Sequence, residues 1–324
     1  MAYRAAVTRG YAHPDGSTIF GRLPWERLTE AGIEWQVLDE ATSPVTASML
    51  QGFDAVMVLG PERIDESSLP VDGRLRHVAR FGAGYDAVDV AALQARGIRL
   101  TNTPDAVREP MAHTALTLLL ALGHNLPAKD RLVREGRWDE RGKYRGRGLI
   151  GATVGIVGFG GIGQAIAALL QPFGVRVVAS NRSDRSAQAA TLGVEMLALP
   201  GLMQTSDYVV VTVPGGEATR HLIGAAELDA LGPHGFLVNI ARGSVVDEQA
   251  LIDRLGDGRL AGAGLDVFER EPLPEGHPLT TLDNVILAPH SLCWTDAFTE
   301  RVAGSMFDSV IAISRGEEPE HAVV

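Results

Sequence analysis

Three polar residues in the C-terminal half of the chain each follow an apolar stretch. Arg242 follows Gly-Phe-Leu-Val-Asn-Ile-Ala, Glu271 lies shortly after Ala-Gly-Ala-Gly-Leu-Asp, and His290 follows Asn-Val-Ile-Leu-Ala-Pro. Because ligands bind beyond the carboxyl ends of the strands in an open parallel sheet, we expect these side chains to converge. A guanidinium, a carboxylate and an imidazole beside a dinucleotide can polarise a carbonyl oxygen and supply a proton. The three residues therefore predict hydride transfer to a carbonyl.

A glycine fingerprint upstream of these residues predicts where the dinucleotide binds. It follows a predicted strand at 152–157 and opens a predicted helix at 162–171. Its first glycine permits a tight turn, the second lets the backbone approach a pyrophosphate, and the third lets the helix pack closely on the strand. Free N–H groups at the helix N-terminus attract the phosphates. The expected cofactor contacts are Gly158, Gly160, Gly161, Ile162 and Gly163.

The residues after the next predicted strand bear on the choice of cofactor. Asn181-Arg182-Ser183 stands where an NAD enzyme usually has an acid that accepts from the ribose hydroxyls. An acid would repel a 2′-phosphate, whereas asparagine, serine and arginine can donate to one. The sequence therefore favours NADP(H), with NAD(H) as the alternative cofactor if Arg182 is only a solvated turn residue.

Composition excludes several classes of protein. The chain has 324 residues, which suits two domains, and a net charge of −11, which disfavours nucleic acid and anionic membranes as partners. A single cysteine, Cys293, excludes an intramolecular disulfide and fits a reducing compartment. The longest apolar run, 115–122, is far shorter than the roughly 20 residues that span a bilayer. We expect a cytoplasmic protein without a metal site.

Both halves of the chain alternate apolar strands with helical patterns, which predicts parallel sheets. In the first half, strands are expected at 4–8, 34–38, 55–59, 77–81 and 98–102, and helices at 25–31 and 90–95. In the second half, strands are expected at 153–157, 176–179, 208–212, 236–240, 260–265 and 285–287, and helices at 162–171, 187–192, 225–231 and 247–255. The predicted fold class is α/β, with two Rossmann-like or flavodoxin-like domains and the active site in the cleft between them.

Three further segments bear on the organisation of the chain. Residues 109–123 read as a helix with apolar residues on nearly every face, so it must be buried on more than one side. A domain junction or a subunit interface would supply that burial, and the alternative is a helix inside one core. Residues 136–148 are polar and glycine-rich, as in a surface loop. The amphipathic segment 295–315 is long enough to cross back onto the first domain.

The chain resembles the D-isomer-specific 2-hydroxyacid dehydrogenases over essentially its whole length. The matching segments, in the family's order and spacing, are Phe81-Gly-Ala-Gly-Tyr-Asp86, Asn102-Thr-Pro104, Val154-Gly-Ile-Val-Gly-Phe-Gly-Gly-Ile-Gly163, Val238-Asn-Ile-Ala-Arg-Gly243, Gly264-Leu-Asp-Val-Phe-Glu-Arg-Glu-Pro272 and Ala288-Pro-His290. The resemblance implies that Arg242, Glu271 and His290 are catalytic, and that Arg242 also binds the substrate.

The resemblance also implies the remaining contacts and the domain organisation. It places Asp266 near the nicotinamide carboxamide. It also implies that backbone N–H groups around Ala83 and Gly84 bind the substrate carboxylate, because a glycine-rich turn can act as an anion nest. Val213 and Pro214 are further expected cofactor contacts. The substrate domain would be discontinuous, 1–102 plus 291–324, with the dinucleotide-binding domain at 103–290. Members of the family commonly form homodimers through the cofactor domain.

The sequence departs from the family pattern at informative places. Asn181-Arg182 looks like the NADPH-using glyoxylate/hydroxypyruvate reductases, which predicts reduction of small 2-keto acids to D-2-hydroxy acids. Trp294 stands where small residues are common, and either narrows the substrate pocket or packs under the final helix. Cys293 is close enough to His290 that we expect bulky thiol reagents to inhibit. The alternatives are a dehydrogenase of phosphoglycerate or phosphite, and a dinucleotide-sensing protein like the corepressors of this fold.

Overall fold

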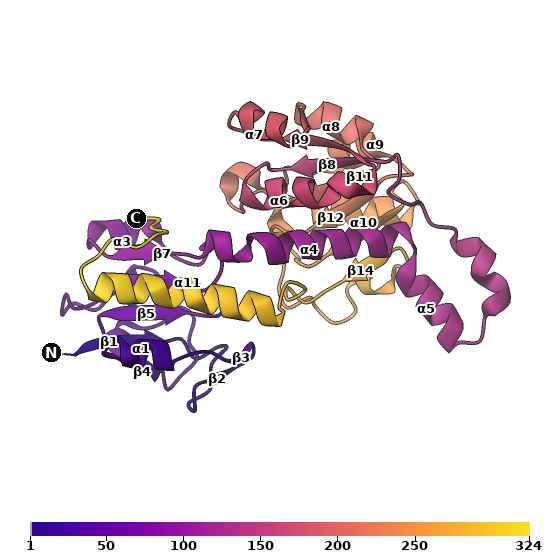
Figure 1. Ribbon diagram of the computed structural model, residues 1–324. Helices are drawn as coiled ribbons and strands as arrows, with labels where there is room; N and C mark the ends of the chain where they lie inside the picture. Colours follow the sequence, from indigo (N-terminus) through magenta and orange to yellow (C-terminus); the bar gives the residue numbers. More distant parts are fainter. Residues whose placement is uncertain (1) are drawn as a thin grey trace. The chain divides into compact units, whose positions relative to one another are not determined.

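The computed structural model describes residues 2–324, which divide into two units (Figure 1). Unit 1 contains the chain up to Pro110 together with Trp294–Val324, and unit 2 contains Met111–Cys293. Each unit is built around its own parallel sheet with helices on both faces. The predicted α/β class with two parallel-sheet domains is therefore confirmed.

Unit 1 has a five-stranded parallel sheet in the order β4-β1-β5-β6-β7. Its strands are β1 (Tyr3–Val7), β4 (Ile33–Val37), β5 (Ala55–Val58), β6 (His77–Arg80) and β7 (Arg99–Thr101). Its helices are α1 (Glu26–Glu30), α2 (Ala47–Leu50), α3 (Val90–Ala95) and α11 (Asp296–Ser314), and a short hairpin pairs β2 (Ser17–Thr18) with β3 (Gly21–Arg22). All five predicted strands of this half are present within one or two residues of their expected ends.

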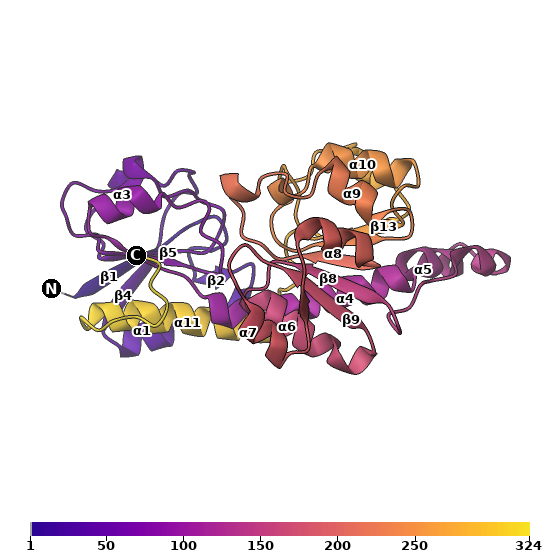
Figure 2. The same cartoon turned by 90° about the horizontal axis from the view of Figure 1, so that it is seen from above.

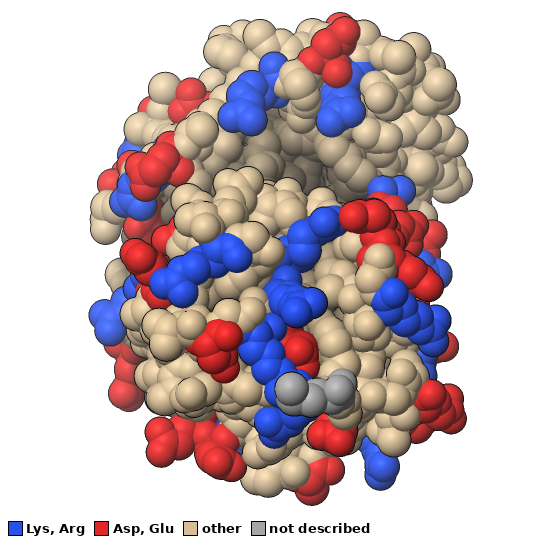
Figure 3. All heavy atoms as spheres, turned by 90° about the vertical axis from the view of Figure 1, so that its left-hand side faces the viewer, with Lys and Arg blue, Asp and Glu red and all other residues tan. Residues whose placement is uncertain are grey.

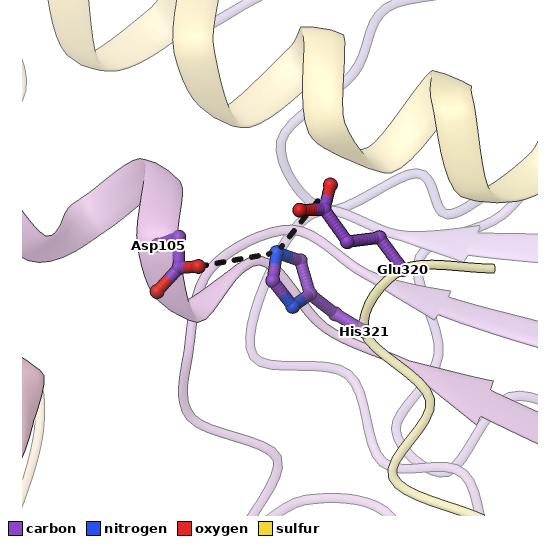
Figure 4. A group of neighbouring side chains, drawn as sticks. All are labelled: Asp105, Glu320 and His321. Carbon is purple, nitrogen blue, oxygen red and sulfur yellow. Dashed lines mark ion pairs between the residues drawn. The ribbon is translucent and has the colours of Figure 1, made fainter.

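The C-terminal tail extends the sheet of unit 1. Ala322 forms an antiparallel bridge with Thr101 of β7, so the tail covers what would be an open sheet edge. Beside it, His321 lies between two carboxylates, 3.7 Å from Asp105 and 3.9 Å from Glu320 (Figure 4). Asp105 also pairs with the guanidinium of Arg108, whose positive charge disfavours a metal cation at this point. We assign this cluster to holding the tail.

Unit 2 has a seven-stranded parallel sheet in the order β10-β9-β8-β11-β12-β13-β14. Its strands are β8 (Thr153–Val157), β9 (Arg176–Ser180), β10 (Glu195–Met196), β11 (Tyr208–Val211), β12 (Phe236–Asn239), β13 (Gly262–Leu265) and β14 (Val285–Leu287). The strands β11, β12 and β13 are buried along their whole length, as in a parallel sheet covered on both faces. The six strands predicted for this half are all present, and β10 is an addition.

Helices cover both faces of the sheet of unit 2 (Figure 2). One apolar core lies under α4 (Pro104–Gly123), α6 (Gly161–Leu170) and α7 (Ser186–Thr191). The other lies under α8 (Leu199–Thr205), α9 (Ala225–Leu231) and α10 (Glu248–Gly256). Strand residues alternate between the two cores, so both faces of every central strand contribute to burial.

The long apolar helix α4 runs from Pro104 to Gly123, and its predicted start at Glu109 was wrong. Proline fits the first turn of a helix because its missing N–H has no partner there, so Pro104 begins the helix instead of preceding it. Ala115 and Leu119 are fully buried in the core of unit 2. In contrast, Leu116 is only half-buried, so part of the apolar surface of α4 is uncovered in the single chain.

After α4 the chain forms α5 (Leu126–Arg134), which was not predicted, and the 3₁₀ helix η2 (Trp138–Tyr144). The polar segment 136–148 lies at the surface as expected, although η2 gives part of it regular structure. Three of its cations are engaged in ion pairs: Arg137 and Lys143 with Glu140, and Arg147 with Asp207.

Charges of both signs are mixed on the surface. Figure 3 shows an irregular row of Lys and Arg side chains with Asp and Glu on both sides of it. Ion pairs within unit 1, such as Arg74–Asp54 at 2.8 Å, neutralise much of the positive charge. Among residues 2–324, no helix is long and apolar enough to cross a membrane.

Candidate active site

His290 and Glu271 form a hydrogen-bonded pair in unit 2, in the loops that follow β14 and β13. Nδ1 of His290 lies 2.7 Å from Oε2 of Glu271, and Oε1 of Glu271 accepts from the N–H of Phe268 at 3.0 Å. The side chains are 46% and 35% exposed, so a ligand can reach them. His290 has a left-handed backbone, with φ of 55°. Two of the three predicted residues are thus in direct contact.

The electrostatic environment keeps Glu271 ionised. Burial acts to raise the pKa of Glu271, but the hydrogen bond and charge of His290, the N–H of Phe268 and the charge of Arg242 outweigh burial. The pKa of this carboxyl therefore lies below its ordinary value. A carboxylate at this position accepts from Nδ1 of His290 and so orients the imidazole ring.

Arg242, the third predicted residue, follows β12 and directly precedes the 3₁₀ helix η5 (Gly243–Val245). Asn239 fixes this turn, because its Nδ2 donates to the carbonyl of Arg242 at 2.9 Å. A Cβ at Gly243 would overlap the Phe268 carbonyl, so only glycine lets this turn lie against the Phe268–Glu269 peptide. The loops that carry Arg242 and Glu271 are therefore in backbone contact.

Asp266 is buried beside these residues and holds the segment after His290. It is 2% exposed, and its Oδ1 accepts from the N–H groups of Ser291 at 3.0 Å and Leu292 at 3.2 Å. Burial raises the pKa of Asp266, although these two N–H groups act against the rise. The sequence predicted that Asp266 contacts the nicotinamide, but it did not predict that Asp266 also holds the segment after His290.

The glycine fingerprint has the geometry that a dinucleotide requires. Gly158 has φ of 102°, and a Cβ there would lie 2.8 Å from the nitrogen of Val213. A Cβ at Gly163 would overlap the carbonyl of Gly158, whereas a Cβ at Gly160 would meet open space. The first and third glycines therefore serve close packing, and the second leaves room for a pyrophosphate at the N-terminus of α6.

Asn181 connects the glycine loop to the turn after β9. Its Oδ1 accepts from the N–H of Phe159 at 2.9 Å, and its Nδ2 donates to the carbonyl of Ser183 at 2.9 Å. The side chains of Arg182 and Ser183 lie at the surface of this turn. These residues fit a dinucleotide in unit 2, because the turn carries a cation and hydroxyl groups and no acid at the position of Asn181.

In unit 1, the turn at Ala83 and Gly84 is held through its carbonyl groups. Asn102 donates to the carbonyl of Ala83 at 2.7 Å, and Arg80 donates to the carbonyl of Gly84 at 3.0 Å. Within residues 2–324, neither N–H group of the pair donates to a protein acceptor. The turn can thus offer two N–H groups to an anion. Sequence reasoning did not anticipate that Arg80 orients it.

Residues 116–291 match the family model described as D-isomer specific 2-hydroxyacid dehydrogenase, NAD binding domain. The chain belongs to this family. It is similar to the glyoxylate reductase of Thermococcus onnurineus, at 39% identity over 291 residues, 88% of this chain and 87% of the relative. The glyoxylate reductase of Thermococcus gammatolerans is 40% identical over 291 residues, which again cover 88% of this chain and 87% of the relative. The protein is therefore an oxidoreductase with an NAD-binding Rossmann domain in unit 2.

A solved structure of a family member has the same fold over the whole chain. The NADPH-dependent glyoxylate/hydroxypyruvate reductase of Sinorhizobium meliloti, in complex with NADP and malonate, superposes with a TM-score of 0.85 at 36% identity. The match covers 100% of this chain and 97% of that one. The resemblance inferred from the sequence motifs is confirmed.

Trp294 is part of an aromatic group in unit 1. Its ring contacts Phe20 edge to face at 4.7 Å and Tyr11 at 6.0 Å, while Phe20 stacks on Phe81 at 4.7 Å. Phe81 directly precedes the turn that contains Ala83 and Gly84. Trp294 therefore packs in an aromatic group that also includes the residue leading into the proposed anion nest.

Cys293 is buried, and the inhibition expected of bulky thiol reagents finds no support in the structure. The thiol is 8% exposed, and burial, with a smaller effect from Asp266, raises its pKa to about 12. Because the thiolate is the reactive form, a thiol of this pKa reacts slowly at neutral pH.

Proposed function

We propose that this protein reduces small 2-keto acids, glyoxylate and hydroxypyruvate first among them, to D-2-hydroxy acids with NADPH as the preferred cofactor. The observation that carries the proposal is the His290–Glu271 pair at 2.7 Å, with Arg242 close enough to lower the pKa of Glu271. An imidazole with an ionised carboxylate on one ring nitrogen is suited to donate a proton from the other. That chemistry matches the reduction of a carbonyl.

His290 supplies the proton in this mechanism. Nδ1 is bound to Glu271, so Nε2 is the nitrogen that donates a proton to the carbonyl oxygen. A bound dihydronicotinamide would supply the hydride that the carbonyl carbon takes up. The C=O double bond would become a C–O single bond, with a new C–H bond from the hydride and a new O–H bond from the proton of His290, and His290 would stay neutral until it takes a proton from water. Glu271 holds the imidazole ring in a fixed orientation before each turnover, because its carboxylate accepts from Nδ1.

The developing negative charge on the oxygen needs a fixed positive partner. Arg242 supplies it, because its guanidinium keeps its charge and its turn is held by Asn239 and by the close packing of Gly243. In unit 1, the N–H groups of Ala83 and Gly84 are proposed to hold a carboxylate, which is the group shared by all 2-keto acids.

The preference for NADPH rests on the turn after β9. With Asn181 engaged by Phe159 and Ser183, the turn presents Arg182 and Ser183 to the ribose 2′ position and has no acid at position 181. Gly160, Val213 and Pro214 are proposed to contact the remainder of the dinucleotide. The complex of the Sinorhizobium meliloti relative with NADP supports this choice.

We also propose a homodimer formed through unit 2. Four large apolar side chains between α5 and residue 150 are more than half exposed: Leu126, Val133, Trp138 and Ile150. Such a concentration of exposed apolar surface marks an interface. Light scattering should give about twice the chain mass of 34.5 kDa, and Val133→Glu should lower it. Val71→Glu, at a position 95% exposed in unit 1, serves as the matched control and should leave the dimer intact.

Initial rates with glyoxylate and hydroxypyruvate, each with NADPH and with NADH, test the proposal. We expect turnover of both acids and a preference for NADPH that falls by about tenfold or more in Arg182→Ala, because one charge-assisted phosphate contact is lost. Arg220→Ala, another surface arginine of unit 2, should retain the preference. Tight cofactor binding without turnover of any 2-keto acid would contradict the proposal and favour a sensor.

A further inference from the structure

A second histidine–glutamate pair has its glutamate, Glu269, in the same loop as Glu271. Nε2 of His221 lies 2.6 Å from Oε1 of Glu269, two residues before Glu271. The two side chains are 36% and 32% exposed, similar to His290 and Glu271. His221 also has a left-handed backbone, with φ of 49°. Such a conformation is uncommon outside glycine and is kept where surrounding contacts determine it.

The main chain of His221 is joined to the turn that carries Arg242. Its N–H donates to the carbonyl of Ser244 at 2.8 Å, and the N–H of Ile223 donates to the carbonyl of Val245 at 3.0 Å. Ser244 and Val245 belong to η5, which begins directly after Arg242. His221 therefore contacts the Arg242 turn through its backbone and the Glu271 loop through its ring.

Glu269 has further hydrogen bonds besides the one with His221, and these hold its side chain and backbone in place. The N–H of Glu269 donates to Oε2 of Glu248 at 3.1 Å, and the N–H of Glu248 points back to Oε1 of Glu269 at 3.4 Å. Oε1 of Glu248 faces Nε2 of His277 at 3.2 Å. The carboxylates of Glu248 and Glu269 are therefore each held by the other residue's N–H, and His221 is a further partner of Glu269.

We propose that His221 is a positioning residue that fixes the Glu271 loop relative to the Arg242 turn. The inference rests on the proposed function, since it assigns those two residues to the same reaction. When the ring of His221 is lost, Glu269 loses this contact and the segment from Phe268 to Glu271 is held less firmly. The Glu271 carboxylate, which orients His290, is then less well placed. The reaction depends on this placement, because a displacement of about 1 Å can lower a rate by about a hundredfold.

His221→Asn separates the ring contact from the backbone conformation. Asparagine tolerates the left-handed region, but its side chain is too short to reach Glu269 as the imidazole does. We expect kcat for keto-acid reduction to fall by about ten- to a hundredfold, while KM for the cofactor stays within about twofold. Glu269→Ala should match this loss. Glu269→Gln, which keeps an oxygen that accepts from His221, should recover most of the rate.

The same substitution at an exposed histidine of unit 2, His234→Asn, is the matched control. A role limited to stability would lower the melting temperature of His221→Asn without changing kcat in the remaining folded enzyme. The double variant His221→Asn/Glu269→Ala should be no slower than either single variant, because both remove one contact. Additive losses, or a wild-type kcat in His221→Asn, would overturn the proposal.

Hydrogen–deuterium exchange gives a readout that does not depend on activity. The N–H of Phe268 donates to Glu271, so its exchange should be faster in His221→Asn and unchanged in His234→Asn. Wild-type exchange in His221→Asn would overturn the inference even if the enzyme is active. If the wild-type protein reduces no 2-keto acid, the proposed function fails, and the exchange comparison still decides whether His221 fixes this loop.

Discussion

Replacing Glu271 with glutamine removes the charge beside His290 and keeps an oxygen that can accept from Nδ1. At the observed 2.7 Å, two unit charges attract by about 1.5 kcal/mol in water and by about 6 kcal/mol at an effective dielectric constant of 20. Because both side chains are more than a third exposed, we expect the lower part of this range, about 1.5–3 kcal/mol. Since about 1.4 kcal/mol is a tenfold change, we expect the rate of reduction at neutral pH to fall by about ten- to a hundredfold.

The assay is the rate of keto-acid reduction between about pH 5 and pH 9. Reduction needs a proton on His290, so Glu271→Gln should lose more of the rate at neutral and alkaline pH than in acid. The two enzymes should approach each other at the acidic end. Glu275→Gln, an exposed acid of the same loop, should behave as the wild type. A uniform loss at every pH would refute the electrostatic part of this reasoning.

Three further predictions concern single side chains. Asp54 accepts from the guanidinium of Arg74 and from the N–H of Arg4, both at 2.8 Å. Burial acts to raise the pKa of Asp54, but these contacts outweigh burial and lower it. The contribution of Asp54 to stability is therefore present above the ordinary pKa of a carboxyl and is lost as the pH falls through the lowered pKa. Asp54→Asn should therefore lower the free energy of unfolding in urea by about 1–3 kcal/mol at neutral pH and by less in acid, and an equal loss at both would contradict the assignment. Cys293 should resist iodoacetamide at neutral pH, which intact-mass measurements would show, and rapid alkylation would contradict its burial. Trp294→Ala should raise kcat/KM for larger 2-keto acids relative to glyoxylate, whereas an unchanged ratio would mean that the ring only packs under α11.

Much of the fold could be predicted because buried parallel strands leave a strong signal. The run Tyr208–Val211 is apolar at every position and is bounded by polar residues, so it reads as a strand without reference to anything else. Elements fixed by tertiary contacts leave a weaker signal. β10 has only two residues, and the tail bridges Thr101 through Ala322 although its sequence carries no strand pattern. The helix α4 starts at Pro104, before the predicted start at residue 109, because proline fits the first turn of a helix.

The candidate site was predictable by residue type and not by contact. Arg242, Glu271 and His290 could be chosen because each follows a strand of one sheet, and their chemistry is complementary. The contacts that orient them come from loops, whose course depends on main-chain hydrogen bonds. Asp266 accepts from the N–H of Ser291, which is 25 positions away along the chain. The ring of His221 contacts Glu269, which is 48 positions away. No local pattern in the sequence predicts contacts between residues so far apart along the chain.

The central claim is that His290 supplies the proton for reduction of a 2-keto acid. The most direct measurement is the consumption of NADPH with glyoxylate by the wild-type enzyme and by His290→Ala, with cofactor binding measured on both proteins. We predict turnover by the wild type and a loss of about a hundredfold or more in the variant, with cofactor affinity unchanged. Turnover that survives in His290→Ala at the wild-type rate would contradict the account.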